Sequence, residues 1–165
     1  MKQTKLSENI CSKIDHWVQK FPAGKQKSAV LMALTSVQDE CGFLSEDLMD
    51  AVAEYLALPK TAVYEVASFY SMYNLKPVGK YYIKVCDSIS CKLCGSSSIL
   101  EHLKQTLGIN LGETTADNLF TLGLAECLAS CCDAPVLIIN DKKYHDNLTT
   151  QKVDDIIANL KDEAK

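Results

Sequence analysis

The chain has 165 residues, a formal net charge of −4 and an apolar fraction of 47%. This length suits one domain or two small ones, and the apolar share is enough to build a core. The acidic balance argues against a nucleic-acid-binding surface, which needs clustered Lys and Arg.

Membrane and export signals are also missing from the sequence pattern. No apolar run approaches the ~20 residues that a membrane helix needs, so we expect no direct membrane insertion. The first residues, from Met1 to Leu6, carry neither an apolar signal core nor an Arg-rich transit pattern. We therefore expect a protein that stays in the compartment where it is made.

The first half of the chain is predicted to be helical. Apolar residues recur at helical spacing in four segments: after the N-cap Ser7, from about Lys25 to Asp39, after the N-cap Ser45, and from Thr61 to Met72. The segment from 74 to 79 then carries Pro77 and Gly79, which are typical of a linker. The predicted domains are therefore a helical N-terminal domain, 1–76, and a second domain, 77–165.

The second half alternates between strand-like and helical patterns. Strands are predicted at 81–85, 119–124, 135–140 and around 143–145, and helices at 96–107 and after the N-cap Thr149. The order is β-α-β-β-β-α, a small mixed sheet covered by two helices. The expected fold class is α+β, with an N-terminal helical bundle followed by a domain compatible with a thioredoxin-like α/β layer.

Eight cysteines are many for a chain of this length. Without a signal peptide they are expected to stay reduced, which points to metal or redox chemistry rather than disulfides. Two pairs, Cys86-x₄-Cys91 and Cys127-x₃-Cys131, each follow a predicted strand, so four thiolates can meet from two loop tips. Thiolates are soft ligands, and a [2Fe–2S] cluster takes four of them. We interpret the pattern as a [2Fe–2S] centre that carries single electrons.

The spacing leaves alternatives open. Zinc sites use C-x₂₋₄-C pairs, which both pairs satisfy, and zinc would make the chain a helical docking adaptor. Cys91-x-x-Cys94 could be a thioredoxin-type redox pair. Cys86-x₄-Cys91-x₂-Cys94 has the plant-type ferredoxin spacing, with Cys127 as fourth ligand and Cys131 left free.

Several motifs resemble one known family. The residues are Val-Cys-Asp-Ser at 85–88, Glu-Cys-Leu-Ala-Ser-Cys at 126–131, Ala-Pro at 134–135 and Val-Tyr-Glu-Val-Ala-Ser-Phe-Tyr at 63–70. Over nearly its whole length the chain resembles the 24-kDa-type [2Fe–2S] subunit of respiratory NADH:quinone oxidoreductase (complex I). The resemblance implies a thioredoxin-like domain with the cluster ligands Cys86, Cys91, Cys127 and Cys131. It leaves Cys94 and Cys132 as spare thiols.

The resemblance also implies partners. These are the FMN- and NADH-binding flavoprotein subunit of the same complex, which would exchange electrons with the cluster, and other iron–sulfur subunits of the peripheral arm. The chain would then be a redox subunit without its own substrate site, and in a bacterium it would be cytoplasmic and peripheral to the inner membrane. The alternative is the equivalent subunit of an NAD-linked hydrogenase or formate dehydrogenase. The chain departs from the family at Ala129, where glycine is usual, and from this alanine we expect a less demanding backbone angle.

Overall fold

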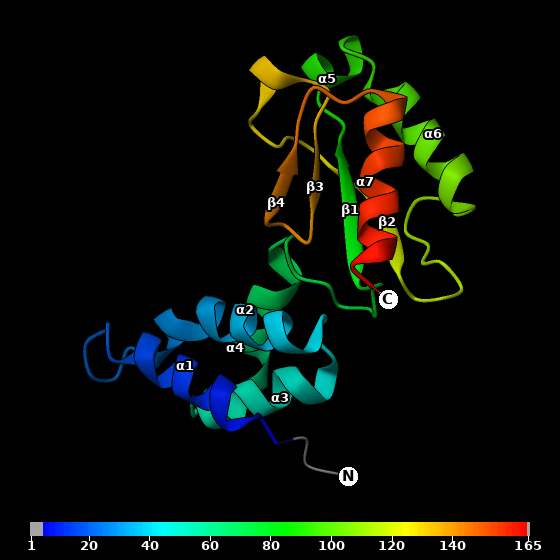
Figure 1. Ribbon diagram of the computed structural model, residues 1–165. Helices are drawn as coiled ribbons and strands as arrows, with labels where there is room; N and C mark the ends of the chain where they lie inside the picture. Colours follow the sequence, from blue (N-terminus) through cyan, green and yellow to red (C-terminus); the bar gives the residue numbers. More distant parts are fainter. Residues whose placement is uncertain (1–4, 165) are drawn as a thin grey trace. The chain divides into compact units, whose positions relative to one another are not determined.

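The computed structural model describes residues 5–164 and divides the chain into two compact units, with the dividing point between Pro77 and Val78 (Figure 1). Across these residues there are seven α-helices and one mixed four-stranded sheet, which confirms the predicted α+β class. No helix between residues 5 and 164 is long and apolar enough to cross a membrane.

The first unit is a helical bundle. It contains α1 (Glu8–Val18), the 3₁₀ helix η1 (Gln26–Ala29), α2 (Val30–Cys41), α3 (Glu46–Tyr55) and α4 (Lys60–Phe69). The predicted N-caps are confirmed: Ser7 Oγ accepts a hydrogen bond from the Ile10 N–H at 3.2 Å, and Ser45 Oγ accepts one from the Leu48 N–H at 3.3 Å. These caps satisfy amide groups that the first helical turn leaves without a partner.

The predicted end of the fourth helix at Met72 is wrong, because α4 ends at Phe69. Tyr70 already has an extended backbone, with φ −90° and ψ 117°. Beyond this end, the Gln38 side chain in α2 donates to the Met72 carbonyl at 2.8 Å and accepts from the Asn74 N–H at 2.6 Å. A long-range side chain thus satisfies backbone groups of the segment that follows the helix.

The second unit contains the sheet, three α-helices and one short 3₁₀ helix (Figure 1). Its elements are β1 (Tyr81–Cys86), α5 (Ile89–Leu93), α6 (Ser96–Leu107), β2 (Phe120–Ala125), the 3₁₀ helix η2 (Cys131–Asp133), β3 (Leu137–Ile139), β4 (Lys143–His145) and α7 (Thr150–Asp162). The strand order is β2-β1-β3-β4, with β1 and β2 parallel and the other two pairs antiparallel. All four predicted strands are present, and the sequence analysis missed α5.

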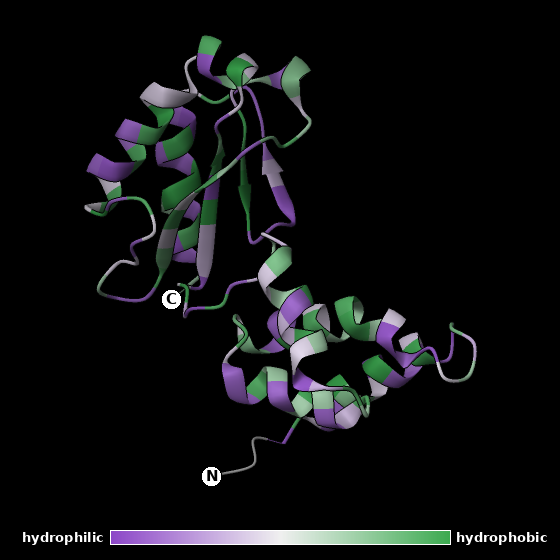
Figure 2. Ribbon diagram, turned by 180° about the vertical axis from the view of Figure 1, so that it is seen from behind, coloured by the Kyte–Doolittle hydropathy of each residue, from purple (hydrophilic) through white to green (hydrophobic). Residues whose placement is uncertain are grey.

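One face of the sheet is covered by α6 and α7, which lie side by side (Figure 1). The core between these layers is apolar and is made by Ile83, Val85, Ile99, Leu103, Phe120, Leu122, Leu137, Val153 and Ile157, among others. After β2 the chain crosses the opposite face of the sheet on its way to η2 (Figure 2). As a result α5 and η2 lie at the same end of the sheet, where β1 and β2 finish.

The turn between β3 and β4 fixes the central strand β1. Asn140 and Asp141 both have φ 53°, a conformation that Asn and Asp tolerate better than most residues. The Asn140 side chain accepts from the Tyr82 N–H at 2.7 Å and donates to the Lys80 carbonyl at 3.0 Å, so it continues the β1–β3 pairing beyond the strand. The strand that ends at Cys86 is therefore held along its whole length.

Candidate metal centre

Cys86 and Cys91 lie together at the carboxyl end of β1. Cys86 is the last residue of β1 and is 2% exposed, and Cys91 lies in α5 and is 1% exposed. Their thiols are close enough to hydrogen-bond to each other. The short helix α5 causes this arrangement, because it turns Cys91 inward while its Ile89 and Leu93 side chains are 78% and 84% exposed.

The loop that follows β2 is attached to this pair by backbone hydrogen bonds. The Cys86 N–H donates to the Val136 carbonyl at 3.0 Å, and the Asp87 N–H donates to the Ala125 carbonyl at 2.8 Å. The Leu128 N–H donates to the Cys86 sulfur, and the Val136 N–H donates to the Cys91 sulfur. Leu128 comes from the segment between Cys127 and Cys131, so both predicted ligand loops reach one place.

Cys127 and Cys131 themselves are exposed, as are Cys94 and Cys132. The Ala129 N–H donates to Cys127 Sγ at 3.4 Å, which shapes a tight turn between the two cysteines. The expectation of an undemanding backbone at Ala129 is wrong: its φ is 55°, in the left-handed region that favours glycine. The turn therefore holds an alanine at a backbone angle that glycine adopts more easily.

The thiols are not gathered into a closed ligand set. Among residues 5–164, no three His, Cys, Asp or Glu side chains stand close enough together to hold a metal ion. The structure thus brings together Cys86 and Cys91, and it places the turn between Cys127 and Cys131 against the Cys86 sulfur without adding either of that turn's thiols to the pair.

The electrostatics of the buried pair suit ligation by thiolate. Burial raises the pKa of the Cys86 thiol, but hydrogen bonds from the Ser88 side chain and from the Ser88 and Leu128 amides outweigh it and hold the pKa below its usual value. Burial raises the pKa of the Cys91 thiol, and the neighbouring Cys86 raises it further. Cys86 is therefore the member of the pair that ionises first.

The donor groups present fit an iron–sulfur cluster in kind. They are cysteine sulfurs, which are soft ligands, and two of them are buried under backbone N–H groups that favour negative charge on sulfur. The cysteine spacing does not identify Ser88, Leu128 and Val136 as sulfur partners. A backbone amide can donate to sulfur whatever its side chain is, so the sequence gives no sign of the Leu128 and Val136 contacts. Of the three partners, Ser88 alone has a polar side chain.

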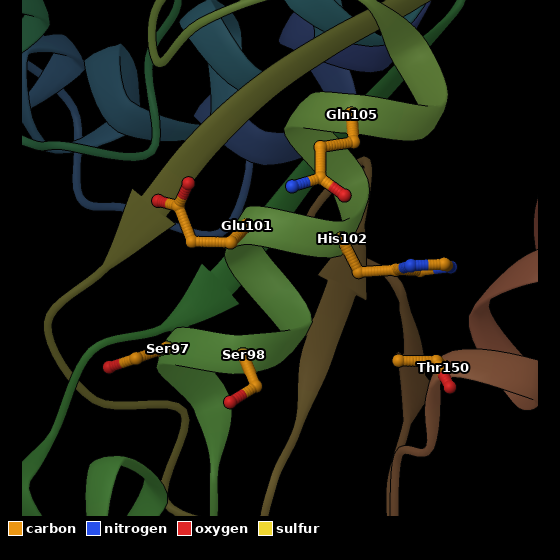
Figure 3. A pocket seen from close by; sticks show the side chains of 6 residues that line it. All are labelled: Ser97, Ser98, Glu101, His102, Gln105 and Thr150. Carbon is orange, nitrogen blue, oxygen red and sulfur yellow. The ribbon is translucent and has the colours of Figure 1, made fainter.

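A separate hollow lies over α6 and the start of α7 (Figure 3). It has a volume of about 450 Å³ and is lined by Ser97, Ser98, Glu101, His102, Gln105 and Thr150. His102 Nε2 lies 2.7 Å from Asp154 Oδ1, which joins α6 to α7. The lining contains none of the cysteines, so this hollow is not part of the candidate centre.

Comparisons with known proteins place the chain in a family. A family model described as thioredoxin-like [2Fe–2S] ferredoxin matches residues 14–161. The chain is 41% identical over 165 residues to a subunit of the NADH-quinone oxidoreductase of Rickettsia felis, covering 99% of this chain and 94% of the relative. It is 40% identical to a subunit of the same kind of complex from Rhizobium meliloti, over 82% of this chain and 80% of the relative.

A solved structure shares the fold. It is an NAD⁺-reducing [NiFe]-hydrogenase in the air-oxidised state, which matches with a TM-score of 0.72 at 23% identity. The match covers 82% of this chain but only 23% of the hydrogenase chain. The family match and the two relatives together settle the expected resemblance: the chain belongs to the thioredoxin-like [2Fe–2S] ferredoxin family, and that membership implies one [2Fe–2S] cluster as its cofactor.

Proposed function

We propose that this chain is an electron-transfer subunit of an NADH-quinone oxidoreductase, with its [2Fe–2S] cluster held by Cys86, Cys91, Cys127 and Cys131. The cluster would exchange single electrons with the FMN of a partner flavoprotein subunit. The observation that carries the proposal is the meeting of the two cysteine loops, in which the Leu128 amide contacts the sulfur of the buried Cys86.

The residues divide the work between them. Cys86 and Cys91 supply a buried, mostly preformed half of the ligand set. Cys127 and Cys131 supply the other half from an exposed turn, where their side chains are free of core packing and can change rotamer. When bound, a [2Fe–2S] cluster takes up and returns one electron.

The choice of parent complex rests on the named relatives. The relatives at about 40% identity are subunits of NADH-quinone oxidoreductases. The hydrogenase likeness, at 23% identity, is a likeness of fold. A partner that binds NADH and FMN follows from this choice, and it would complement a chain that carries no glycine-rich dinucleotide motif in its sequence.

Single cysteine replacements test the ligand assignment. Each of the eight cysteines is changed to serine, and iron, inorganic sulfide and visible absorption are measured on protein purified without oxygen. Loss of iron is expected for the four proposed ligands, whereas Cys94→Ser and Cys132→Ser serve as matched controls because they lie beside ligands and are also exposed. Loss at Cys94 with retention at Cys131 would instead support the plant-type spacing. A colourless, zinc-containing wild type would refute the electron-transfer role.

Purification from the native source tests the complex. We expect a tagged chain to bring down a subunit that contains FMN, together with a quinone-reducing activity that uses NADH. Recovery with a hydrogen-oxidising or formate-oxidising unit in its place would transfer the chain to the alternative complexes.

A further inference from the structure

Four α-helices in the described part of the chain begin after a serine or threonine, and one of these residues behaves differently. Ser7, Ser45 and Thr149 each accept a hydrogen bond from an amide in the first turn of their helix. Ser88 stands in the same position before α5, with the same extended backbone, φ −65° and ψ 156°, as Ser7. Its side chain makes no capping hydrogen bond to α5 within the described residues.

The hydroxyl of Ser88 is turned to sulfur instead. The Cys86 thiol donates to Ser88 Oγ at 3.4 Å, and the Ser88 side chain also hydrogen-bonds the Cys91 sulfur. When both sulfurs are deprotonated ligands they only accept, so the hydroxyl is then the donor to one of them. A serine in this position gives up a favourable contact with its helix, which an N-cap normally makes. The geometry therefore favours a function for the hydroxyl at the two sulfurs rather than at the helix.

We infer that Ser88 is a positioning residue that tunes the cluster: its hydroxyl donates its one O–H to a ligand sulfur and raises the reduction potential. This inference rests on the proposed function, because it requires Cys86 and Cys91 to be ligands. The contact is made from this chain's own loop and needs no partner subunit.

The direction of the effect follows from charge. Two ferric ions, two sulfides and four thiolates sum to a charge of about −2, and one added electron makes it about −3. A hydroxyl dipole aimed at a ligand sulfur stabilises the more negative, reduced form more than the oxidised form. Hydrogen bonds to charged acceptors are roughly twice as strong as neutral ones. Removing the hydroxyl is therefore expected to make reduction harder.

The test uses the full-length, cluster-loaded protein with two replacements of Ser88 that have the same shape as each other. Ser88→Thr keeps a hydroxyl, and Ser88→Val has the same shape without it. Ser88→Ala adds a small variant without a hydroxyl, and Ser90→Ala is the control, because Ser90 is an exposed serine two residues further on, in α5. Iron and sulfide are quantified first. The midpoint potential is then measured by titration with dithionite as electron donor, with the electron paramagnetic resonance spectrum of the reduced form.

We expect the equilibrium constant for reduction to fall about tenfold in Ser88→Val and Ser88→Ala, which is about 59 mV lower for one electron. Ser88→Thr and Ser90→Ala should stay near the wild type. Equal potentials in the valine and threonine variants would overturn the inference while leaving the cluster assignment intact. So would loss of iron in both variants that lack a hydroxyl, because Ser88 would then serve assembly. A wild type without iron would remove the proposed function itself.

Discussion

The ion pair between Lys84 and Asp141 gives the sharpest test of how the sheet is held. Lys84 lies in β1, two residues before Cys86, and its side chain is only 8% exposed, whereas that of Asp141 is 36% exposed. The Lys84 Nζ lies 3.0 and 2.8 Å from the two Asp141 carboxylate oxygens and 4.8 Å from the centre of the Tyr82 ring. The carboxylate is thus the charge partner of a largely buried ammonium.

The perturbation is Asp141→Asn. Asparagine keeps the side-chain shape and tolerates the φ of 53° at this turn, so the change removes charge and little else. Leaving a fully buried charge without its partner costs about 3–5 kcal/mol. Asp141 is partly exposed and the amide oxygen still accepts one hydrogen bond, so we expect a loss of about 2 kcal/mol. With an m value of about 2 kcal/mol per molar, the urea midpoint falls by about 1 M.

The assay is urea unfolding followed by far-ultraviolet circular dichroism. Glu101→Gln is the matched control, because it makes the same chemical change in the Lys104–Glu101 pair, whose glutamate is 61% exposed. An exposed pair is worth less than about 1 kcal/mol. Adding Lys84→Met to Asp141→Asn removes the stranded charge and should recover stability. Equal losses in the two single variants, or no recovery in the double variant, would refute the argument.

Two further predictions concern strained or buried groups of the second unit. Ala129→Gly should stabilise the protein by about 0.5 kcal/mol in urea unfolding, because relief of the left-handed alanine is partly offset by the unfolded-state entropy of glycine. The control Ala53→Gly, in the middle of α3, should destabilise the protein. A loss of stability in both variants would show that Ala129 is not strained. Burial lowers the pKa of His145, helped by Lys143 and Lys152, so the unfolded state binds the proton more tightly and stability should fall as pH drops below about 6.5. His145→Gln should flatten that pH profile, and an unchanged slope would assign it to other groups.

Local signals in the sequence were enough to predict much of the fold. The serines and the threonine that begin α1, α3 and α7 cap those helices, and the apolar runs around Ile83 and Leu122 form parallel neighbours in the sheet. Such features depend on residues within a few positions of each other, so their spacing is visible in the chain. The motifs at 126–131 likewise indicated the family before the fold was known.

The features that the sequence did not predict depend on distant parts of the chain. The segment after α4 is held by Gln38, which lies 34 positions from its backbone partner Met72. The helix α5 is five residues long, too short to show a helical period of its own. The left-handed Ala129 was predicted in the wrong direction, because residue type was taken to set the backbone angle, whereas the turn between Cys127 and Cys131 sets it. Propensity gives way to context in each case.

The same distinction bears on the choice between the ligand sets that the spacing left open. Cys91 and Cys94 are three residues apart, and spacing treats them alike, but burial separates them: Cys91 is 1% exposed beside Cys86, whereas Cys94 is exposed at the end of α5. Burial cannot separate Cys127 from Cys131, since both are exposed. The turn between them can be judged by what it contacts. Its Leu128 amide donates to the Cys86 sulfur. Cys127 and Cys131 flank Leu128 in the chain, so this contact holds their turn next to Cys86. That contact supports Cys127, which both ligand sets share, and the iron content of the Cys94→Ser and Cys131→Ser variants decides between Cys94 and Cys131 as the fourth ligand.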